Sequence, residues 1–209
     1  MKKALIAVYA RAPVPGEAKT RLIPALGPGG AAVLHARLVK RMLGEAIAAG
    51  IGPVELWCTP DDTHPFFAHC TTRFDIALKT QGQGDLGERM TQTIADGLGR
   101  ADSVLLVGSD IPDLSAVHLV RARDALDTSD AVFIPAEDGG YGLVGMTRPL
   151  PALFDGIVWG GPQVMQATRE RAVAAGLRLA ELEPLWDLDR PEDVARLAPA
   201  LLAGLAKPE

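Results

Sequence analysis

Apolar runs and amphipathic stretches alternate along this chain, and their order predicts an α/β fold with a mostly parallel sheet under helices. The apolar runs predict strands over residues 4–10, 54–59, 73–79, 104–107, 131–136 and 177–182. Apolar positions at helical spacing, with Gly and Pro at the ends, predict helices over residues 30–49, 64–70, 86–99, 115–126, 163–175 and 191–202. A further apolar stretch, 143–146, follows residues 137–142, a glycine-rich segment typical of a hairpin.

The run Val104–Val107 is the most informative of these strands, because it is apolar throughout and leads directly into Gly108, Ser109 and Asp110. A strand of this kind is buried on both faces of a parallel sheet. Asp110 should therefore stand at the carboxyl end of a central strand, which is where open α/β sheets bind ligands. A carboxylate there is suited to a hard divalent cation. The alternative is that Asp110 only begins a turn, since Pro112 follows it.

Length and charge narrow the possible functions. The 209 residues are expected to form one domain, 1–209, and the net charge of −5 argues against a nucleic-acid or anionic-membrane partner. No apolar stretch approaches the roughly 20 residues that a membrane-spanning helix needs. Cys58 and Cys70 cannot form a disulfide framework and suit a reduced cytoplasm, which is the predicted location.

The segment between the first strand and the first helix is basic and conformationally restricted. Pro13, Pro15 and Gly16 predict a loop of fixed shape, and Arg11, Lys19 and Arg21 give it three cations. Such a loop can hold a polyphosphate, with planar paired donors from Arg and a mobile charge from Lys. It lacks the spacing of a P-loop. The alternative is a solvated loop without function.

Residues 82–87 match the pattern Gly-x-Gly-x-x-Gly at the start of a predicted helix. A dinucleotide fingerprint is disfavoured, because Asp85 would bring the wrong charge to a pyrophosphate and because the motif does not follow the first strand. Two interpretations stay open: a glycine-rich turn that closes over a bound base, or a plain loop with a helix N-cap.

Acidic residues mark two later segments. Asp138 lies among glycines that permit close approach of a ligand, so it could be a second carboxylate or could accept a substrate hydroxyl. Asp187 and Asp189 precede Pro191, and they are either turn residues or further metal ligands. Asp193 suits the third position of the last helix and so has a structural role.

Together these motifs resemble the DUF2064 family, also described as radical-SAM/selenodomain-associated glycosyltransferases, of the nucleotide-diphospho-sugar transferase (GT-A) superfamily. The resemblance extends over nearly the whole chain. It rests on five stretches with characteristic residues: Pro13–Leu22, Gly84–Met90, Gly108–Pro112, Pro135–Tyr141 and Asp187–Asp193. The chain departs from the family's usual pattern at Arg11, Arg190 and Gly142, and the change at Gly142 bears on the acceptor pocket.

The resemblance implies a three-layer α/β/α, Rossmann-like GT-A fold that binds a nucleotide across the carboxyl edge of its sheet. Asp110, with Asp189, would hold Mg²⁺ or Mn²⁺, and Asp138 is the candidate catalytic carboxylate, assisted by Lys19 and Arg21. The nucleotide-binding candidates are drawn from the first loop and the glycine motif: Arg11, Lys19, Arg21, Gly84, Asp85, Gly87 and Arg89.

Three functions are compatible with these residues. The first is a metal-dependent transferase that moves a sugar from a nucleotide-activated donor to a small acceptor. The second is a nucleotidyltransferase that takes an NTP and releases pyrophosphate, which the cluster Lys19-Thr20-Arg21 favours. The third is a nucleotide-binding protein without turnover. The fold alone does not choose between them.

Overall fold

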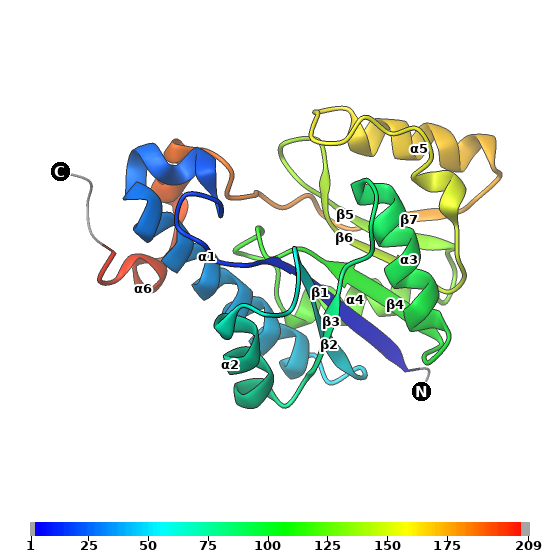
Figure 1. Ribbon diagram of the computed structural model, residues 1–209. Helices are drawn as coiled ribbons and strands as arrows, with labels where there is room; N and C mark the ends of the chain where they lie inside the picture. Colours follow the sequence, from blue (N-terminus) through cyan, green and yellow to red (C-terminus); the bar gives the residue numbers. More distant parts are fainter. Residues whose placement is uncertain (1–2, 206–209) are drawn as a thin grey trace.

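The computed structural model describes residues 3–205, and its seven strands form one mixed sheet in the order β3-β2-β1-β4-β6-β5-β7 (Figure 1). The strands are β1 (Ala4–Arg11), β2 (Val54–Thr59), β3 (Ala77–Thr80), β4 (Ser103–Val107), β5 (Ala131–Pro135), β6 (Tyr141–Met146) and β7 (Leu179–Glu181). Every neighbouring pair is parallel except those that involve β6, which runs antiparallel to β4 and β5. The α/β prediction with a mostly parallel sheet is confirmed.

Helices cover both faces of the sheet. The α-helices are α1 (Ile23–Ala48), α2 (Pro65–Phe74), α3 (Leu86–Leu98), α4 (Ala116–Ala125), α5 (Val164–Ala174) and α6 (Pro199–Leu202). Three short 3₁₀ helices are η1 (Thr20–Leu22), η2 (Pro151–Leu153) and η3 (Pro191–Arg196). Buried side chains of α1, α2 and α4 belong to the core on one face, and those of α3, η2 and α5 to the core on the other. This is the expected three-layer arrangement.

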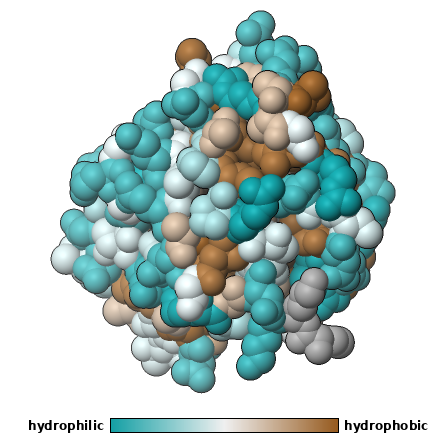
Figure 2. Space-filling model, turned by 90° about the vertical axis from the view of Figure 1, so that its right-hand side faces the viewer, coloured by the Kyte–Doolittle hydropathy of each residue, from teal (hydrophilic) through white to brown (hydrophobic). Residues whose placement is uncertain are grey.

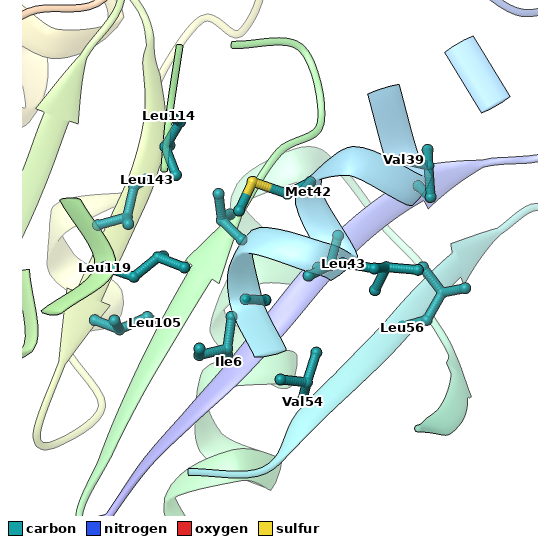
Figure 3. Packing of buried hydrophobic residues seen from close by; sticks show 14 of the residues in the cluster. Ile6, Val39, Met42, Leu43, Val54, Leu56, Leu105, Leu114, Leu119 and Leu143 are labelled. Carbon is teal, nitrogen blue, oxygen red and sulfur yellow. The ribbon is translucent and has the colours of Figure 1, made fainter. Parts of the chain in front are cut away.

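Successive side chains of β1 point alternately into the two cores, one on each face of the sheet. Ile6 and Val8 face the α1 core, whereas Leu5 and Ala7 face the α3 core, and all four are fully buried. Figure 3 shows α1 side chains lying against residues of β1 and β2. All five residues of β4 are buried, as its continuous apolar sequence predicted.

Helix α1 begins earlier than predicted. Its first turn, from Ile23, joins the main helix across a kink at Gly27, whose φ of 65° is non-helical. The Pro and Gly residues of this segment concealed that turn, because they disfavour helix interiors. By length and composition alone, α1 could cross a membrane, a test that buried core helices also pass. In this fold its inner face, with Leu34 and Leu38, is buried.

Two other predictions of secondary structure were wrong in part. The strand predicted from Arg73 begins only at Ala77, because α2 continues to Phe74 and ends at Asp75 in a left-handed conformation (φ 51°). The helix predicted over 191–202 is divided into η3 and α6, with extended backbone at Leu197. Pro199 contributes to the break, since the residue before a proline avoids the α-helical region, and Ala198 has a ψ of 137°.

The surface in Figure 2 shows hydrophobic residues at several places among hydrophilic ones. Large hydrophobic side chains that are exposed include Val158 at 86% and Val173 at 80%. Scattered exposure of this kind is ordinary for a protein surface.

The chain after β7 crosses the carboxyl edge of the sheet and ends beside the start of α1 (Figure 1). Trp186 and Leu188 of this segment are buried with Leu22 and Leu34. Strand β1 is paired with β2 on one side and with β4 on the other. The chain continues from β1 to β2 in one direction across the sheet and from β4 toward β5 in the other, so the strand order reverses between β1 and β4. Such a switch point is where α/β sheets bind ligands.

Candidate functional site

The loop between β1 and η1 has a fixed shape, as its prolines predicted. The amides of Glu17 and Ala18 donate to the Val14 carbonyl oxygen at 3.0 Å, and Gly16 has a φ of 86°. Lys19, the last residue before η1, is also left-handed, with φ 51° and ψ 44°. A non-glycine residue in that region costs about 1–2 kcal/mol. Such a conformation persists where surrounding contacts enforce it.

Those contacts are made by the Lys19 ammonium, whose side chain is only 8% exposed. Its Nζ lies 2.9 Å from Oδ1 of Asp110 and donates to the carbonyl oxygen of Leu188 at 2.5 Å. The Leu188 amide in turn donates to the Asp110 carbonyl oxygen at 2.9 Å. Lys19 therefore connects the first loop, the end of β4 and the C-terminal segment at the switch point of the sheet.

Arg21 and Asp189 form a second ion pair between the same two segments. The two predicted metal ligands are thus each paired with a cation of the first loop. Arg11, the third predicted cation, points elsewhere: it is exposed, and its guanidinium donates to the Glu17 carbonyl oxygen at 3.4 Å. The structure therefore brings Lys19 and Arg21 to the carboxylates but leaves Arg11 outside the cluster.

Asp110 keeps its charge in this setting. Partial desolvation raises the pKa of its carboxyl, but the Lys19 charge and further polar contacts outweigh that effect and hold the pKa below its ordinary value. Beneath the loop, burial lowers the pKa of His35, whose Nε2 donates to the Arg11 carbonyl oxygen at 2.9 Å. A neutral His35 thereby fixes the end of β1 on α1.

Asp138 and Asp187 bring two more carboxylates to this edge of the sheet. The Asp138 amide donates to Oδ1 of Asp187 at 3.3 Å, and Oδ1 of Asp138 accepts from the Gly140 amide at 2.8 Å. Desolvation and the nearby charges of Asp138 and Asp189 raise the pKa of Asp187. The carboxylates of Asp138, Asp187 and Asp189 are thus close enough for their negative charges to repel one another.

One cavity of about 270 Å³ joins these residues. Four carboxylates that the sequence analysis named line it: Asp110, Asp138, Asp187 and Asp189. Its other walls come from β1, α3, β4, β6 and the loop before α5, and they are largely apolar. No Lys or Arg side chain of the described residues lines it.

The glycine motif at the start of α3 has a clear structural role. Asp85 caps the helix: its Oδ1 accepts from the Glu88 amide at 2.9 Å, and the Glu88 carboxylate accepts from the Asp85 amide at 2.8 Å. Gly87 is buried, and a Cβ there would lie 2.8 Å from the Trp159 ring. Arg89 donates to Oε1 of Gln81 at 2.9 Å. The N-cap interpretation is confirmed, whereas contact of Gly84, Asp85, Gly87 and Arg89 with a nucleotide stays a prediction.

The C-terminal segment is clamped over the sheet edge by side chains outside the cavity. Trp186 Nε1 donates to Asp113 at 2.6 Å, and Arg196 makes two hydrogen bonds to Glu137. Asp193 accepts from the Arg190 amide at 2.7 Å, which is a structural role of the kind predicted for it.

In the part of the chain that the structure describes, no three His, Cys, Asp or Glu side chains are arranged to hold a metal ion. The donors nevertheless fit a hard cation in kind, since all four charged groups of the cavity are carboxylates. Asp110 and Asp189 could supply two ligands, and phosphate oxygens or water would have to supply the others.

Sequence reasoning left one feature of the site open and missed another. Asp187 was left open between a turn residue and a ligand, and only the fold shows that it faces the same cavity as Asp138. Leu188 contributes through its carbonyl oxygen, and no side-chain pattern can signal that.

Comparison with known proteins places this arrangement in context. Residues 42–161 match the family described as "Uncharacterized protein conserved in bacteria (DUF2064)". No curated protein matches the chain.

Many solved structures share the fold, and three of them illustrate the range of similarity. A "putative nucleotide-diphospho-sugar transferase" from Desulfovibrio desulfuricans G20 is 33% identical, with a TM-score of 0.82 over 91% of this chain and 84% of that one. A nucleotidyl transferase from Methanothermobacter thermautotrophicus is 15% identical (TM-score 0.63; 96% and 98% covered). The manganese complex of Rv0371C from Mycobacterium tuberculosis H37Rv is 19% identical (TM-score 0.53; 96% and 98% covered). The last two support the fold only.

Proposed function

This chain belongs to the DUF2064 family, and we propose that it is a metal-dependent transferase that uses a nucleotide-activated sugar. The observation that carries the proposal is the pair of contacts Lys19–Asp110 and Arg21–Asp189 at the sheet's switch point, beside a cavity. The 33% identical D. desulfuricans protein, described as a nucleotide-diphospho-sugar transferase, supports it.

A nucleoside diphosphate and a divalent cation would bind by replacing the partners of the two ion pairs. Lys19 and Arg21 are held near the strand ends by carboxylates, and a phosphate can take the place of those carboxylates as their partner. A divalent cation, in turn, can take the place of the two cations beside Asp110 and Asp189. One neighbour of the same fold, from M. tuberculosis, is a manganese complex, which is consistent with Mg²⁺ or Mn²⁺ as the proposed ion. When bound, the cation would neutralise negative charge on the leaving phosphate.

The remaining site residues have distinct roles in this proposal. Asp138 lines the cavity and belongs to neither ion pair, so it is the carboxylate that would accept a proton from an acceptor hydroxyl. In the transfer, the hydroxyl oxygen bonds to the anomeric carbon while the bond from that carbon to the phosphate oxygen breaks. The nucleoside diphosphate departs with the electron pair, and the hydroxyl proton passes to Asp138.

The other nucleotide-binding candidates stand at the same edge of the sheet. Arg11 ends β1, and the segment from Gly84 to Arg89 follows β3. We propose that they lie along the nucleotide, with the glycine-rich turn Gly84–Gly87 near its base. Asp85 would act there by holding the turn in shape, because its side chain and its amide both take part in the cap of α3.

A nucleotidyltransferase is the second candidate, because Lys19 and Arg21 could equally contact a triphosphate. The two reactions release different products. Nucleotidyl transfer yields pyrophosphate from an NTP, whereas sugar transfer yields a nucleoside diphosphate. Binding of a nucleotide with neither product would indicate a protein without turnover.

A thermal-shift screen of NTPs, NDPs and nucleotide sugars, each with Mg²⁺, Mn²⁺ or chelator, tests the proposal. A ligand that binds the native state raises the melting temperature by mass action. We expect a metal-dependent rise with a nucleotide sugar, lost in Asp110→Ala but kept in Asp124→Ala, which removes an exposed carboxylate of α4. A rise with NTPs alone would favour nucleotidyl transfer. No rise with any nucleotide would contradict both.

A further inference from the structure

The residues that line the cavity beside Asp110 come from two chemically different places, the apolar core under α3 and the acidic segments that follow β4, β5 and β7. Its floor is formed by apolar side chains that also belong to the α3 core: Leu86, Met90, Leu106 and Val144. The rings of Tyr9, Tyr141 and Trp159 add aromatic walls, and Tyr141 meets Trp159 edge-on at 6.4 Å between centroids. The four aspartates are the only charged residues among the described residues that line it.

The floor offers few free hydrogen-bonding groups. The Tyr9 hydroxyl already contacts the Arg89 carbonyl oxygen at 2.9 Å and Thr93 at 2.7 Å. The Gly108 amide donates to the Gly142 carbonyl oxygen at 2.9 Å. Trp159 Nε1 and the Tyr141 hydroxyl are buried and have no hydrogen-bond partner among the described residues. These two groups are fewer than the hydroxyls of a sugar would need as partners.

This lack of partners decides against a sugar on the floor. Each buried hydroxyl that finds no partner is penalised by about 1–3 kcal/mol, and a hexose has five. An apolar ring of the same size gains from burial instead. By size, the site accepts more than a single ring: a cavity of about 150 Å³ in another protein holds benzene, and this one is about 270 Å³.

We propose that the cavity binds the acceptor, and that the acceptor is a small alcohol with an apolar, ring-sized body. Its body lies on the floor between Met90 and the aromatic walls, and its hydroxyl points to Asp138 at the acidic end. The assignment as acceptor rests on the proposed transferase function. The donor sugar then stays at the acidic end, next to Asp110, and does not enter the floor.

The charge at that end adds a second criterion. An acceptor that ends in a carboxylate would bring a negative charge against Asp138 and Asp187, neither of which forms an ion pair with a cation of the described residues. An alcohol of the same skeleton avoids that repulsion. The site therefore selects both for an apolar body and against an anionic end.

Calorimetry on the full chain with three probes tests this inference: 3-phenylpropan-1-ol, 3-phenylpropanoate and glucose. We expect the alcohol to bind at least 10-fold more tightly than the carboxylate, and glucose to show no heat. Binding of glucose equal to that of the alcohol would overturn the proposal, as would a carboxylate that binds as tightly as the alcohol.

Two variants locate the binding. Leu86→Trp places a larger side chain at the partly exposed start of α3, in the cavity wall, and should weaken the alcohol at least 10-fold. Val173→Trp adds the same residue at a position that is 80% exposed, outside the cavity, and should leave the affinity unchanged. Equal affinity in all three proteins would overturn the assignment. Should Leu86→Trp fail to fold, quenching of tryptophan fluorescence by the alcohol, absent in Trp159→Phe, replaces it.

The nucleotide screen keeps the two proposals separate. Nucleotide binding without alcohol binding would refute the acceptor class and leave the transferase proposal intact. Alcohol binding without any nucleotide effect would refute the transferase proposal, and with it the role of this ligand as acceptor.

Discussion

Lys19→Met tests whether one ammonium group both fixes the first loop and serves the site. The substitution keeps an unbranched chain of similar length but removes the charge. It abolishes the 2.9 Å contact with Asp110 and the 2.5 Å hydrogen bond to the Leu188 carbonyl oxygen. The Leu188 carbonyl oxygen then loses the hydrogen bond from Lys19, and the Leu188 side chain beside it is fully buried.

The loss of stability can be estimated from these two contacts. A hydrogen bond from a charged group contributes about 1.5–3 kcal/mol. Because the Asp110 side chain is 55% exposed, solvent screens the ion pair, and we assign it only about 0.5–1 kcal/mol. The sum of about 2–4 kcal/mol corresponds to a fall in melting temperature of roughly 4–16 °C for a protein of this size.

Lys19→Gly provides a matched comparison, because it removes the same contacts and also relieves the left-handed backbone. That relief returns about 1–2 kcal/mol. The melting temperature of Lys19→Gly should therefore be higher than that of Lys19→Met. In an ordinary loop position the order would be reversed, because glycine adds conformational freedom to the unfolded chain.

The effect on binding is expected to be specific to phosphate. Loss of one charge-assisted contact of about 1.5–3 kcal/mol raises a dissociation constant roughly 10- to 150-fold. Calorimetry with a nucleoside diphosphate should show that loss, while the affinity for the corresponding nucleoside changes less than about 3-fold.

Two results would refute this reasoning. A melting temperature of Lys19→Met equal to that of the wild type would show that the ammonium does not hold the three segments together. Equal losses of affinity for the nucleoside and its diphosphate would show that Lys19 does not contact phosphate. Because melting and calorimetry are separate measurements, the structural and the functional roles can fail independently.

Three further predictions concern the surrounding site. Asp110→Ala should remove the metal dependence of nucleotide binding in calorimetry while the far-UV circular dichroism stays unchanged. If the variant bound the nucleotide in the presence of metal as tightly as the wild type, Asp110 would not be part of the site. Gly139→Ala should lower stability by at least about 2 kcal/mol in urea unfolding, because Gly139 has a φ of 89° and a Cβ would lie 2.0 Å from the Pro162 carbonyl oxygen. The contact with Arg196 lowers the pKa of Glu137, so its contribution to stability is present above the unfolded pKa of about 4.3 and is lost as the pH falls through the lower folded value. The melting temperatures of the wild type and Glu137→Gln should therefore differ at pH 7 and converge in acid; a constant difference would contradict that account.

Several features of this protein followed from the sequence because short-range patterns cause them. The apolar run Val104–Val107 is a fully buried central strand, and Asp110 follows its carboxyl end as predicted. The prolines and Gly16 of the first loop fix its backbone locally. The capping pair Asp85 and Glu88 is three residues apart and depends only on the first turn of α3.

Other features depend on residues that are distant in the sequence, so only the tertiary structure decided them. Lys19 meets Leu188 across 169 residues, and Arg21 meets Asp189 across 168. No spacing rule links such positions, because their approach depends on where the C-terminal segment crosses the sheet. The last predicted helix failed for a related reason: the segment is held by its contacts with Asp113 and Glu137 while Pro199 interrupts it.

The cavity shows the same division most clearly. The sequence supplied its carboxylates one at a time, since each follows a strand or a turn with its own local signal. The apolar floor was hidden, because Met90, Leu106 and Val144 are indistinguishable in sequence from ordinary core residues. Whether an apolar side chain faces another side chain or an open cavity depends on how helices and strands pack, and that is a property of the folded chain alone.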